Sequence, residues 1–279
     1  MKPNCEGCFV KKIILAVLCT VMAVVALIPM LMLLQLAFNP PDLVSGEGRF
    51  ALHIPTLVNF RDALEQSNLP RAMFNSLIIT VSSLVLTVIF SACASYEIAR
   101  FPFWLNRFSY GLFLFSMAVP SIISTVPLYI LMRSFGAINT YWGMILLNTA
   151  SCLPFSIFLY TSFIRATPRE MEEAALIDGC SWFGGFWRIV FPVLKPVTST
   201  VILLNAVTFW NEYGRSVFFL QKQSRYTMPL AISMFIQKYS AQWNLMAAAS
   251  VIALIPTVAV FLSFQKYFVK GLAAGAVKG

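Results

Sequence analysis

Six long apolar runs constrain the fold of this chain more than any other feature. They cover residues 13–38, 77–95, 108–132, 142–164, 197–220 and 245–264. A helix that crosses a bilayer needs roughly 20 mostly apolar residues, so each run is a candidate membrane span. Only 11% of the chain is charged and 59% is hydrophobic, whereas a soluble domain carries about 25% charged residues. The sequence therefore predicts an all-α, polytopic membrane protein with six transmembrane helices.

Prolines lie inside several of these runs. Pro120 and Pro127 fall within the third run, Pro154 within the fourth and Pro256 within the sixth. A spanning helix tolerates proline when neighbouring helices satisfy the carbonyl group that it frees. We therefore expect kinked helices that pack as a bundle around a pathway.

The basic residues set the expected orientation. Six spans place both termini on one side; if that side is the cytoplasm, 12 of the 20 Lys and Arg residues face it and 8 face outward. This inequality favours cytoplasmic termini. The chain then divides into a cytoplasmic tail (1–12), a first helix with an outer loop (13–70), a five-helix core (71–265) and a second cytoplasmic tail (266–279).

The sequence lacks the residue patterns that a catalytic, nucleotide-binding or metal site in this chain would require. A phosphate-binding loop needs Lys after its last glycine, but the closest spacing, Gly179 to Gly184, is followed by Gly185. The single histidine, His53, cannot build a His-based metal site. The net charge of +9 comes from basic residues at the ends of apolar runs, which suits lipid headgroups and not nucleic acid. We expect no catalytic site, no metal and no bound cofactor.

The longest predicted cytoplasmic connection, residues 165–195, contains two short helices. Thr167 can cap the first helix, Pro168 fits its first position and Glu170 can complete a capping box. Glu170 and Glu173 share a face of this helix. Because acids near a helix start stabilise its dipole, they are interpreted as structural and not as a catalytic pair.

The second short helix is apolar almost all round. Gly179 can end the first helix in a left-handed turn, and Ser181 can cap a second helix that runs from 182 to about 191 and ends at Pro192. Isolated helices of about ten residues are marginal in water. The second helix must therefore pack on this chain's membrane core or on another protein; a hairpin lying on lipid is the alternative.

The same segment carries a recognisable motif. Glu173-Ala174-Ala175, then Gly179 and later Pro192, resembles the EAA motif of permease subunits in bacterial binding-protein-dependent ABC importers. Further matches are at 74–77, 127–129, 136–140, 209–213 and the tail 265–279, which resembles the ending of sugar permeases such as the inner-membrane subunits of maltose and glycerol-phosphate importers. Cys180 is a mild departure, where we expect a small residue such as alanine. The resemblance covers nearly the whole chain.

The resemblance implies a transporter subunit and no enzyme. Such a permease sits in the bacterial inner membrane and pairs with a second permease, usually a different chain. Two cytoplasmic ATPase subunits bind ATP and Mg, and an external binding protein delivers the solute. The ATPase-docking residues implied for this chain are Glu173, Ala174, Ala175, Ile177, Asp178, Gly179 and Pro192. Glu173 contacts the ATPase, Ala174 and Ala175 give a close fit, and Gly179 makes the turn.

The fifth run contains an acid and a base, Glu212 and Arg215. At the bilayer centre each costs roughly 2.5–3.5 kcal/mol, so we expect them off-centre or facing a wet cavity. Three interpretations stay open: a gate or pathway role, a helix-stabilising ion pair made by their i, i+3 spacing, and surface placement. The remaining candidate pathway residues are Trp210, Asn211, Tyr213, Tyr129 and Asn148. Their aromatic rings can stack on a sugar, although packing is the alternative.

The loop between the fifth and sixth runs faces the side from which solute arrives. It is polar and contains Arg225 and Lys238, which we expect to contact the binding protein. Carbohydrate is the expected solute. The alternatives are an importer of the same architecture for a polyamine or phosphate ester, and a membrane-embedded enzyme or receptor with no ATPase partner.

Overall fold

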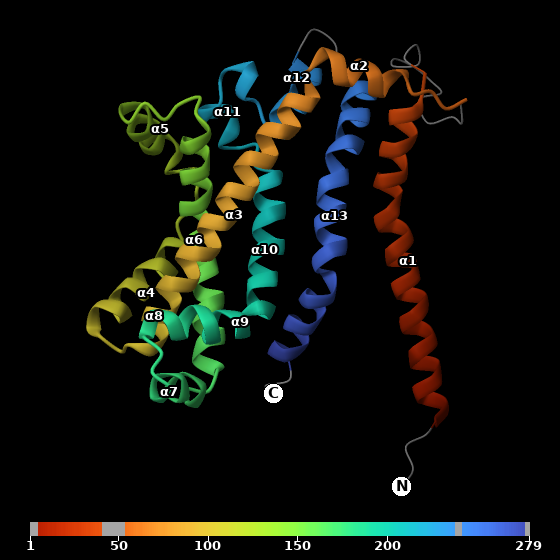
Figure 1. Ribbon diagram of the computed structural model, residues 1–279. Helices are drawn as coiled ribbons and strands as arrows, with labels where there is room; N and C mark the ends of the chain where they lie inside the picture. The colour runs from red at the N-terminus through yellow and green to blue at the C-terminus, as the bar shows by residue number, and fades with distance from the viewer. Residues whose placement is uncertain (1–4, 41–53, 238–241, 277–279) are drawn as a thin grey trace. The chain divides into compact units, whose positions relative to one another are not determined.

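A computed structural model of the protein describes residues 5–40, 54–237 and 242–276 (Figure 1). Every regular element in these ranges is helical, which confirms the predicted all-α class. The chain divides into two compact units. One comprises the chain up to Leu69 together with Ile232–Ile252, and the other comprises Pro70–Ala231 together with the chain from Ala253 onward.

The first unit is built on a long N-terminal helix and a short amphipathic one. These are α1 (Cys5–Phe38) and α2 (Val58–Gln66), with part of α12 (Met228–Gln237) and the start of α13 (Trp243–Ala276). The buried Asn59 of α2 donates hydrogen bonds to the carbonyls of Ala37 (2.9 Å) and Asn39 (2.7 Å). These bonds satisfy carbonyls at the end of α1 that have no helical partner.

The second unit contains the remaining elements. In chain order they are α3 (Leu69–Arg100), α4 (Trp104–Ser116), α5 (Thr125–Ser134), α6 (Tyr141–Ala166), α7 (Glu170–Ile177), α8 (Trp182–Gly185), the π-helix η2 (Phe186–Val190), α9 (Phe191–Val193), α10 (Lys195–Trp210), α11 (Ser216–Phe219) and η3 (Gln223–Arg225). The rest of α12 and α13 completes the unit.

Small polar residues hold α3, α6 and α10 together. Ser95 of α3 donates a hydrogen bond to the Ile157 carbonyl of α6 at 3.0 Å. Asn205 of α10 donates to the Ser156 hydroxyl at 3.0 Å, and the Tyr160 hydroxyl to Thr198 at 2.9 Å. Such residues allow close approach of helices inside a membrane, where apolar burial alone gives little driving force.

Four helical stretches are long and apolar enough to cross a membrane: Lys11–Phe38, Leu69–Arg100, Tyr141–Ala166 and Trp243–Gln265. The pair Trp182–Val193 and Lys195–Trp210, bent by 73°, passes the same test jointly. By length and composition, the described residues therefore contain four spans, or five if the bent pair is one span. The structure confirms a polytopic chain but does not confirm six spans.

The third predicted span is not a single helix. α4 ends at Ser116, a run of turns follows, and α5 begins at Thr125. Pro120 lies in the break; its fixed φ and missing N–H disfavour a continuous helix there. The Ser124 hydroxyl donates to the Ser121 carbonyl at 2.8 Å, which satisfies part of the freed backbone. The expectation of one kinked helix over 108–132 is therefore wrong.

The fifth predicted span is also shorter than expected. α10 ends at Trp210, and residues 211–215 form a turn before α11. The Glu212 carboxylate accepts a hydrogen bond from the Arg215 backbone N–H at 2.7 Å, an interaction that stabilises this turn. The two charged residues thus lie beyond the end of α10 and not inside a spanning helix.

Candidate functional site

Two short helical arms form an exposed hairpin between α6 and α10, here called the coupling hairpin (residues 167–194). Its first arm, α7, ends in a left-handed turn at Gly179, whose φ is 82°. The Gly179 N–H donates to Leu176 O at 3.1 Å and the Cys180 N–H to Ala175 O at 3.0 Å. This is the Schellman pattern, and it confirms the predicted glycine turn. The second arm begins as predicted, because the Ser181 hydroxyl accepts from the Gly184 N–H at 3.2 Å.

The start of α7 differs from the prediction. Thr167 follows the last residue of α6, and its hydroxyl donates to the Phe163 carbonyl at 3.0 Å. The residue before α7 is Arg169, which makes no side-chain cap. The predicted capping box is therefore wrong, since the Thr167 hydroxyl is used by the preceding helix. The acids of the first turn are Glu170, Glu172 and Glu173, as expected for the positive end of a helix dipole.

The two faces of α7 differ in exposure. Glu173, Ala174 and Ile177 are exposed, with Ile177 86% exposed. Ala175 is only 3% exposed and lies against this chain, so it cannot provide the direct fit to a partner that the motif implies. The remaining motif residues, Asp178, Gly179 and Pro192, are exposed.

The second arm of the hairpin is partly buried in the chain's own core. Phe186 and Val190 belong to a core cluster with Tyr160, Leu194 and Val201. The apolar character of this arm is therefore explained largely by packing on α3, α6 and α10. Its first two residues, Trp182 and Phe183, remain exposed.

A buried ion pair fastens α7 to the end of α3. The Arg100 Nε donates to Glu172 Oε1 at 2.8 Å, and Tyr96 OH donates to Glu172 Oε2 at 3.1 Å. Arg100 is 7% exposed and Glu172 is 8% exposed. This pair was not predicted from the sequence, because the partners are separated by 72 residues. The only hint in the sequence is a basic residue at the end of an apolar run, on the same side as an acid-rich loop.

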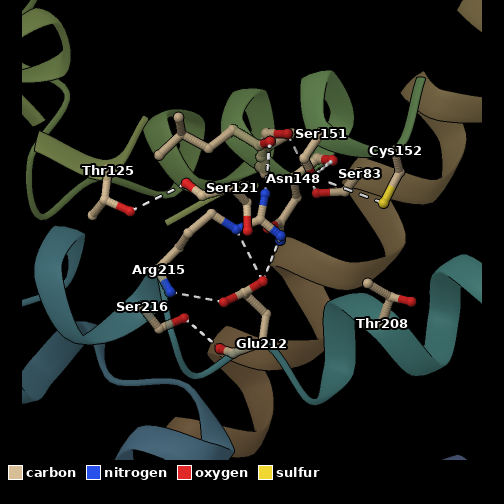
Figure 2. Close-up of polar contacts among 12 residues, drawn as sticks. Ser83, Ser121, Thr125, Asn148, Ser151, Cys152, Thr208, Glu212, Arg215 and Ser216 are labelled. Atoms are coloured by element: carbon tan, nitrogen blue, oxygen red, sulfur yellow. Dashed lines mark hydrogen bonds and ion pairs between the residues drawn. The ribbon is translucent and has the colours of Figure 1, made fainter. Parts of the chain in front are cut away.

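A second charged pair lies after α10, and Figure 2 shows its carboxylate pointing toward the guanidinium. Arg215 Nε donates to Glu212 Oε2 at 2.9 Å, and its Nη2 pairs with the same oxygen. Arg215 Nη1 also donates to the Leu147 carbonyl of α6 at 3.2 Å. The ion pair that the i, i+3 spacing allows is therefore present, and it is tied to α6.

Arg215 lines a cavity of about 780 Å³ between α4, α5, α6 and α11. Five hydroxyl residues line it as well: Ser116, Ser121, Ser124, Thr125 and Ser151. Leu128, Leu147 and Phe219 add apolar surface. Among the lining residues Arg215 is the only charged one, and Glu212 pairs with it. Eight of the lining residues are apolar, and four of the five hydroxyl groups donate to backbone carbonyls. The cavity thus offers hydroxyl oxygens mainly as acceptors, without a free charge.

The other candidate pathway residues do not gather at this cavity. Asn148 is fully buried next to Leu147, and neither of its amide atoms has a hydrogen-bond partner among the described residues. Trp210 is buried and donates to the Ala253 carbonyl at 3.1 Å. Asn211 and Tyr213 are exposed on the turn after α10, and the hydroxyl of Tyr129 accepts from Gln221 at 3.1 Å. Of the predicted set, Asn148, Glu212 and Tyr129 lie next to residues that line the cavity, and the centroid of the Tyr129 ring is 5.9 Å from that of Phe219.

The loop between α11 and α12 (residues 220–227), which is predicted to face outward and is here called the outer loop, is anchored by residues of α3 and α6. Asn75 donates to the carbonyls of Tyr226 (2.8 Å) and Ser224 (3.2 Å), and it accepts from the Tyr141 hydroxyl at 2.7 Å. The Arg225 guanidinium lies 4.2 Å from the centroid of the Tyr141 ring. Arg225 is thus partly buried. The second predicted contact residue, Lys238, lies outside the described residues.

A bundle of long apolar helices with an exposed two-helix hairpin defines the transmembrane subunit of an ABC importer. A solved structure with the same fold, a bacterial ABC transporter that imports the acidic polysaccharide alginate, has a TM-score of 0.81 and 20% sequence identity; the match covers 96% of this chain and 99% of that one. The chain belongs to the family of binding-protein-dependent transport system inner membrane components, which it matches over residues 85–274.

Several relatives are similar over most of their length. The melibiose/raffinose/stachyose import permease protein MelC of Bacillus subtilis is 38% identical over 267 residues, 95% of this chain and 96% of that protein. The arabinooligosaccharide permease AraQ of the same species is 33% identical, covering 74% and 73%. AmyC of Thermoanaerobacterium thermosulfurigenes, a probable permease for starch degradation products, is 34% identical, covering 80% and 81%. This chain is accordingly an ABC importer permease subunit.

Proposed function

We propose that this permease forms half of the membrane pathway for a carbohydrate in a bacterial inner membrane. A second permease, of a different chain, supplies the other half. An extracytoplasmic solute-binding protein delivers the sugar, and two cytoplasmic ATPase subunits bind ATP and Mg. The names of MelC, AraQ and AmyC, which all refer to oligosaccharides or starch products, support the solute class.

The observation that carries the proposal is the exposed face of α7. Glu173, Ala174 and Ile177 are exposed side by side, while Glu172 and Ala175 of the same helix face the chain. Together with the exposed Trp182 and Phe183 of the second arm, Ile177 gives the hairpin exposed apolar surface that suits a protein partner better than water. In the family this segment meets the ATPase. Glu173 then pairs with a basic residue, Ala174 permits close approach, and Ala175 lets α7 lie close to its own core.

The hydroxyl-lined cavity is the best candidate for the solute pathway. Because four of its five hydroxyl groups donate to backbone carbonyls, their oxygens remain free to accept hydrogen bonds from the hydroxyl groups of a sugar. Because Glu212 neutralises Arg215, the cavity offers no unpaired charge to a polyamine or a phosphate ester. This arrangement favours an uncharged carbohydrate over those alternatives.

The chain itself carries neither ATP nor metal in this proposal. The termini and the coupling hairpin face the cytoplasm, and the loop around Arg225 faces the binding protein. The excess of basic residues on the terminal side supports this orientation. Transport energy then enters at the coupling hairpin, on the side opposite to the binding protein.

A matched pair of charge reversals tests the docking face. Glu173→Lys reverses a charge on the exposed motif face, while Glu97→Lys makes the same change at an exposed glutamate of α3, outside α7. We expect Glu173→Lys to abolish retention of the ATPase during purification and Glu97→Lys to retain it. Equal retention in both variants contradicts docking through this face. Sugars are then screened for stimulated ATP hydrolysis by the intact complex with its binding protein.

A further inference from the structure

The C-terminal end of α3 contacts both arms of the coupling hairpin. Arg100 pairs with Glu172 of α7. On the other arm, the Tyr96 ring lies 4.9 Å from the Phe186 ring, and Phe101, directly after α3, lies 5.5 Å from the Trp182 ring. The hairpin is therefore seated on α3 as well as on α6 and α10.

Arg100 makes the polar contacts between the end of α3 and the first arm of the hairpin, together with Tyr96. Its Nη2 donates to Glu172 Oε1 at 2.5 Å and to the Thr167 carbonyl at 3.1 Å. Its own carbonyl accepts from Arg169 Nη2 at 3.2 Å. The polar groups of Arg100 thus contact the segment before α7 and the first turn of α7 itself.

Glu172 differs from its neighbours on α7. Glu170 and Glu173 are exposed, whereas Glu172 is buried and accepts hydrogen bonds from Arg100 and Tyr96. Separating a buried pair leaves each charge uncompensated in a low-dielectric environment, which is strongly unfavourable. The aromatic contacts of the other arm are less directional than this charged pair. The ion pair is therefore the contact that most strongly opposes separation of α7 from α3.

The opposite end of α3 holds the outer loop. Asn75, in the second turn of α3, donates to the carbonyls of Ser224 and Tyr226, and the Ser76 hydroxyl accepts from the Met228 N–H at 2.8 Å. α3 has 32 residues, and a helix rises about 1.5 Å per residue. One helix thus joins the coupling hairpin to the loop at the other end of the unit.

We propose that Arg100 and Glu172 are positioning residues for energy coupling. Their ion pair makes α7 and α3 move as one body, so that a displacement of α7 reaches the outer loop. The inference rests on the proposed function, because it assumes an ATPase on α7 and a binding protein at the loop. Since coupling between two sites is reciprocal, binding at the loop also acts on the ATPase through α3.

Neutralising variants test the coupling. Glu172→Gln and Arg100→Gln each leave one buried charge alone, while the double variant leaves none. We expect all three to retain the ATPase and its basal hydrolysis, because the exposed face of α7 is unchanged. In each single variant, hydrolysis stimulated by the sugar-loaded binding protein should fall about tenfold, and it should recover partly in the double variant.

Two outcomes of that experiment overturn the proposal. Full stimulation of ATP hydrolysis in both single variants shows that the ion pair takes no part in coupling. Loss of the ATPase in Glu172→Gln shows that the pair only maintains the fold of the hairpin. The comparison of Glu173→Lys with Glu97→Lys tests the docking face separately, so failure of docking and failure of this proposal can be told apart.

Cross-linking tests the requirement that the two helices move together. Cysteines replace Arg100 and Glu172 in a cysteine-free background with verified transport, and a short bismaleimide joins them within the assembled complex. We expect transport to be low before cross-linking and to rise after it, because the covalent bridge replaces the ion pair. Transport that stops on cross-linking shows that α7 and α3 must separate during the cycle, which overturns the proposal.

Discussion

Arg215, on the turn after α10, donates a hydrogen bond to the backbone carbonyl of Leu147 in α6, 68 residues earlier in the chain. The same guanidinium is held by Glu212, so the ion pair bridges two segments around the hydroxyl-lined cavity (Figure 2). The pair therefore has a structural role in addition to any contact with solute.

Removing one partner of this bridge should destabilise the protein. Arg215→Gln leaves the Glu212 carboxylate without its counter-charge and the Leu147 carbonyl with a weaker donor. We expect a loss of about 1–3 kcal/mol in unfolding free energy, together with a large loss of transport. Thermal unfolding in detergent and uptake into proteoliposomes measure the two effects. Arg107→Gln, the same change at an exposed arginine of α4, is the control and should leave both unchanged.

Gly179 should be sensitive to any side chain. No atom lies within 4 Å of a Cβ built at this position, so the cost of Gly179→Ala comes from its φ of 82° alone. We expect a loss of about 1–2 kcal/mol in stability of the hairpin, seen as faster proteolysis there. Gly185→Ala is the matched control, because Gly185 has equal space and a helical φ of −61°. Equal proteolysis of the two variants contradicts the role of the turn.

Gly143 is constrained by space and not by backbone conformation. A Cβ at this position lies 2.3 Å from the backbone oxygen of Ala137, which cannot move without rebuilding the turn before α6. Gly143→Ala should therefore lower stability by about 3 kcal/mol and reduce the amount of folded protein in membranes. Gly111→Ala, at a site with open space, should behave as the unmodified protein. Thermal unfolding of both variants checks the difference.

Two variants distinguish direct contact between Arg225 and the binding protein from a role of Arg225 in holding the outer loop in place. If the binding protein contacts its charge, Arg225→Glu should raise the concentration of loaded binding protein needed for half-maximal ATP hydrolysis. Tyr141→Leu removes the ring beneath Arg225 and the hydrogen bond to Asn75 but keeps the charge of Arg225. A similar defect in both variants indicates that Tyr141 and Arg225 hold the loop in place. A defect confined to Arg225→Glu indicates direct contact, and normal hydrolysis in both contradicts docking at this loop.

The orientation can be tested by labelling single cysteines in intact cells. A cysteine at Arg169, which is exposed in the coupling hairpin, should be inaccessible to a membrane-impermeant maleimide. A cysteine at Lys222, which is exposed in the outer loop, should react. The reverse pattern contradicts the proposed topology.

The sequence determined the all-helical membrane class, the family and the hairpin with its Gly179 turn, because these depend on local composition and on residues close in the chain. It misplaced the third and fifth spans, since apolar character persists through breaks that Pro120 and the Glu212 turn create. Only the tertiary structure decided which face of α7 is free and that Glu172 is paired with Arg100. Three neighbouring glutamates look alike in sequence, and only the packing of α7 against α3 takes one of them out of water.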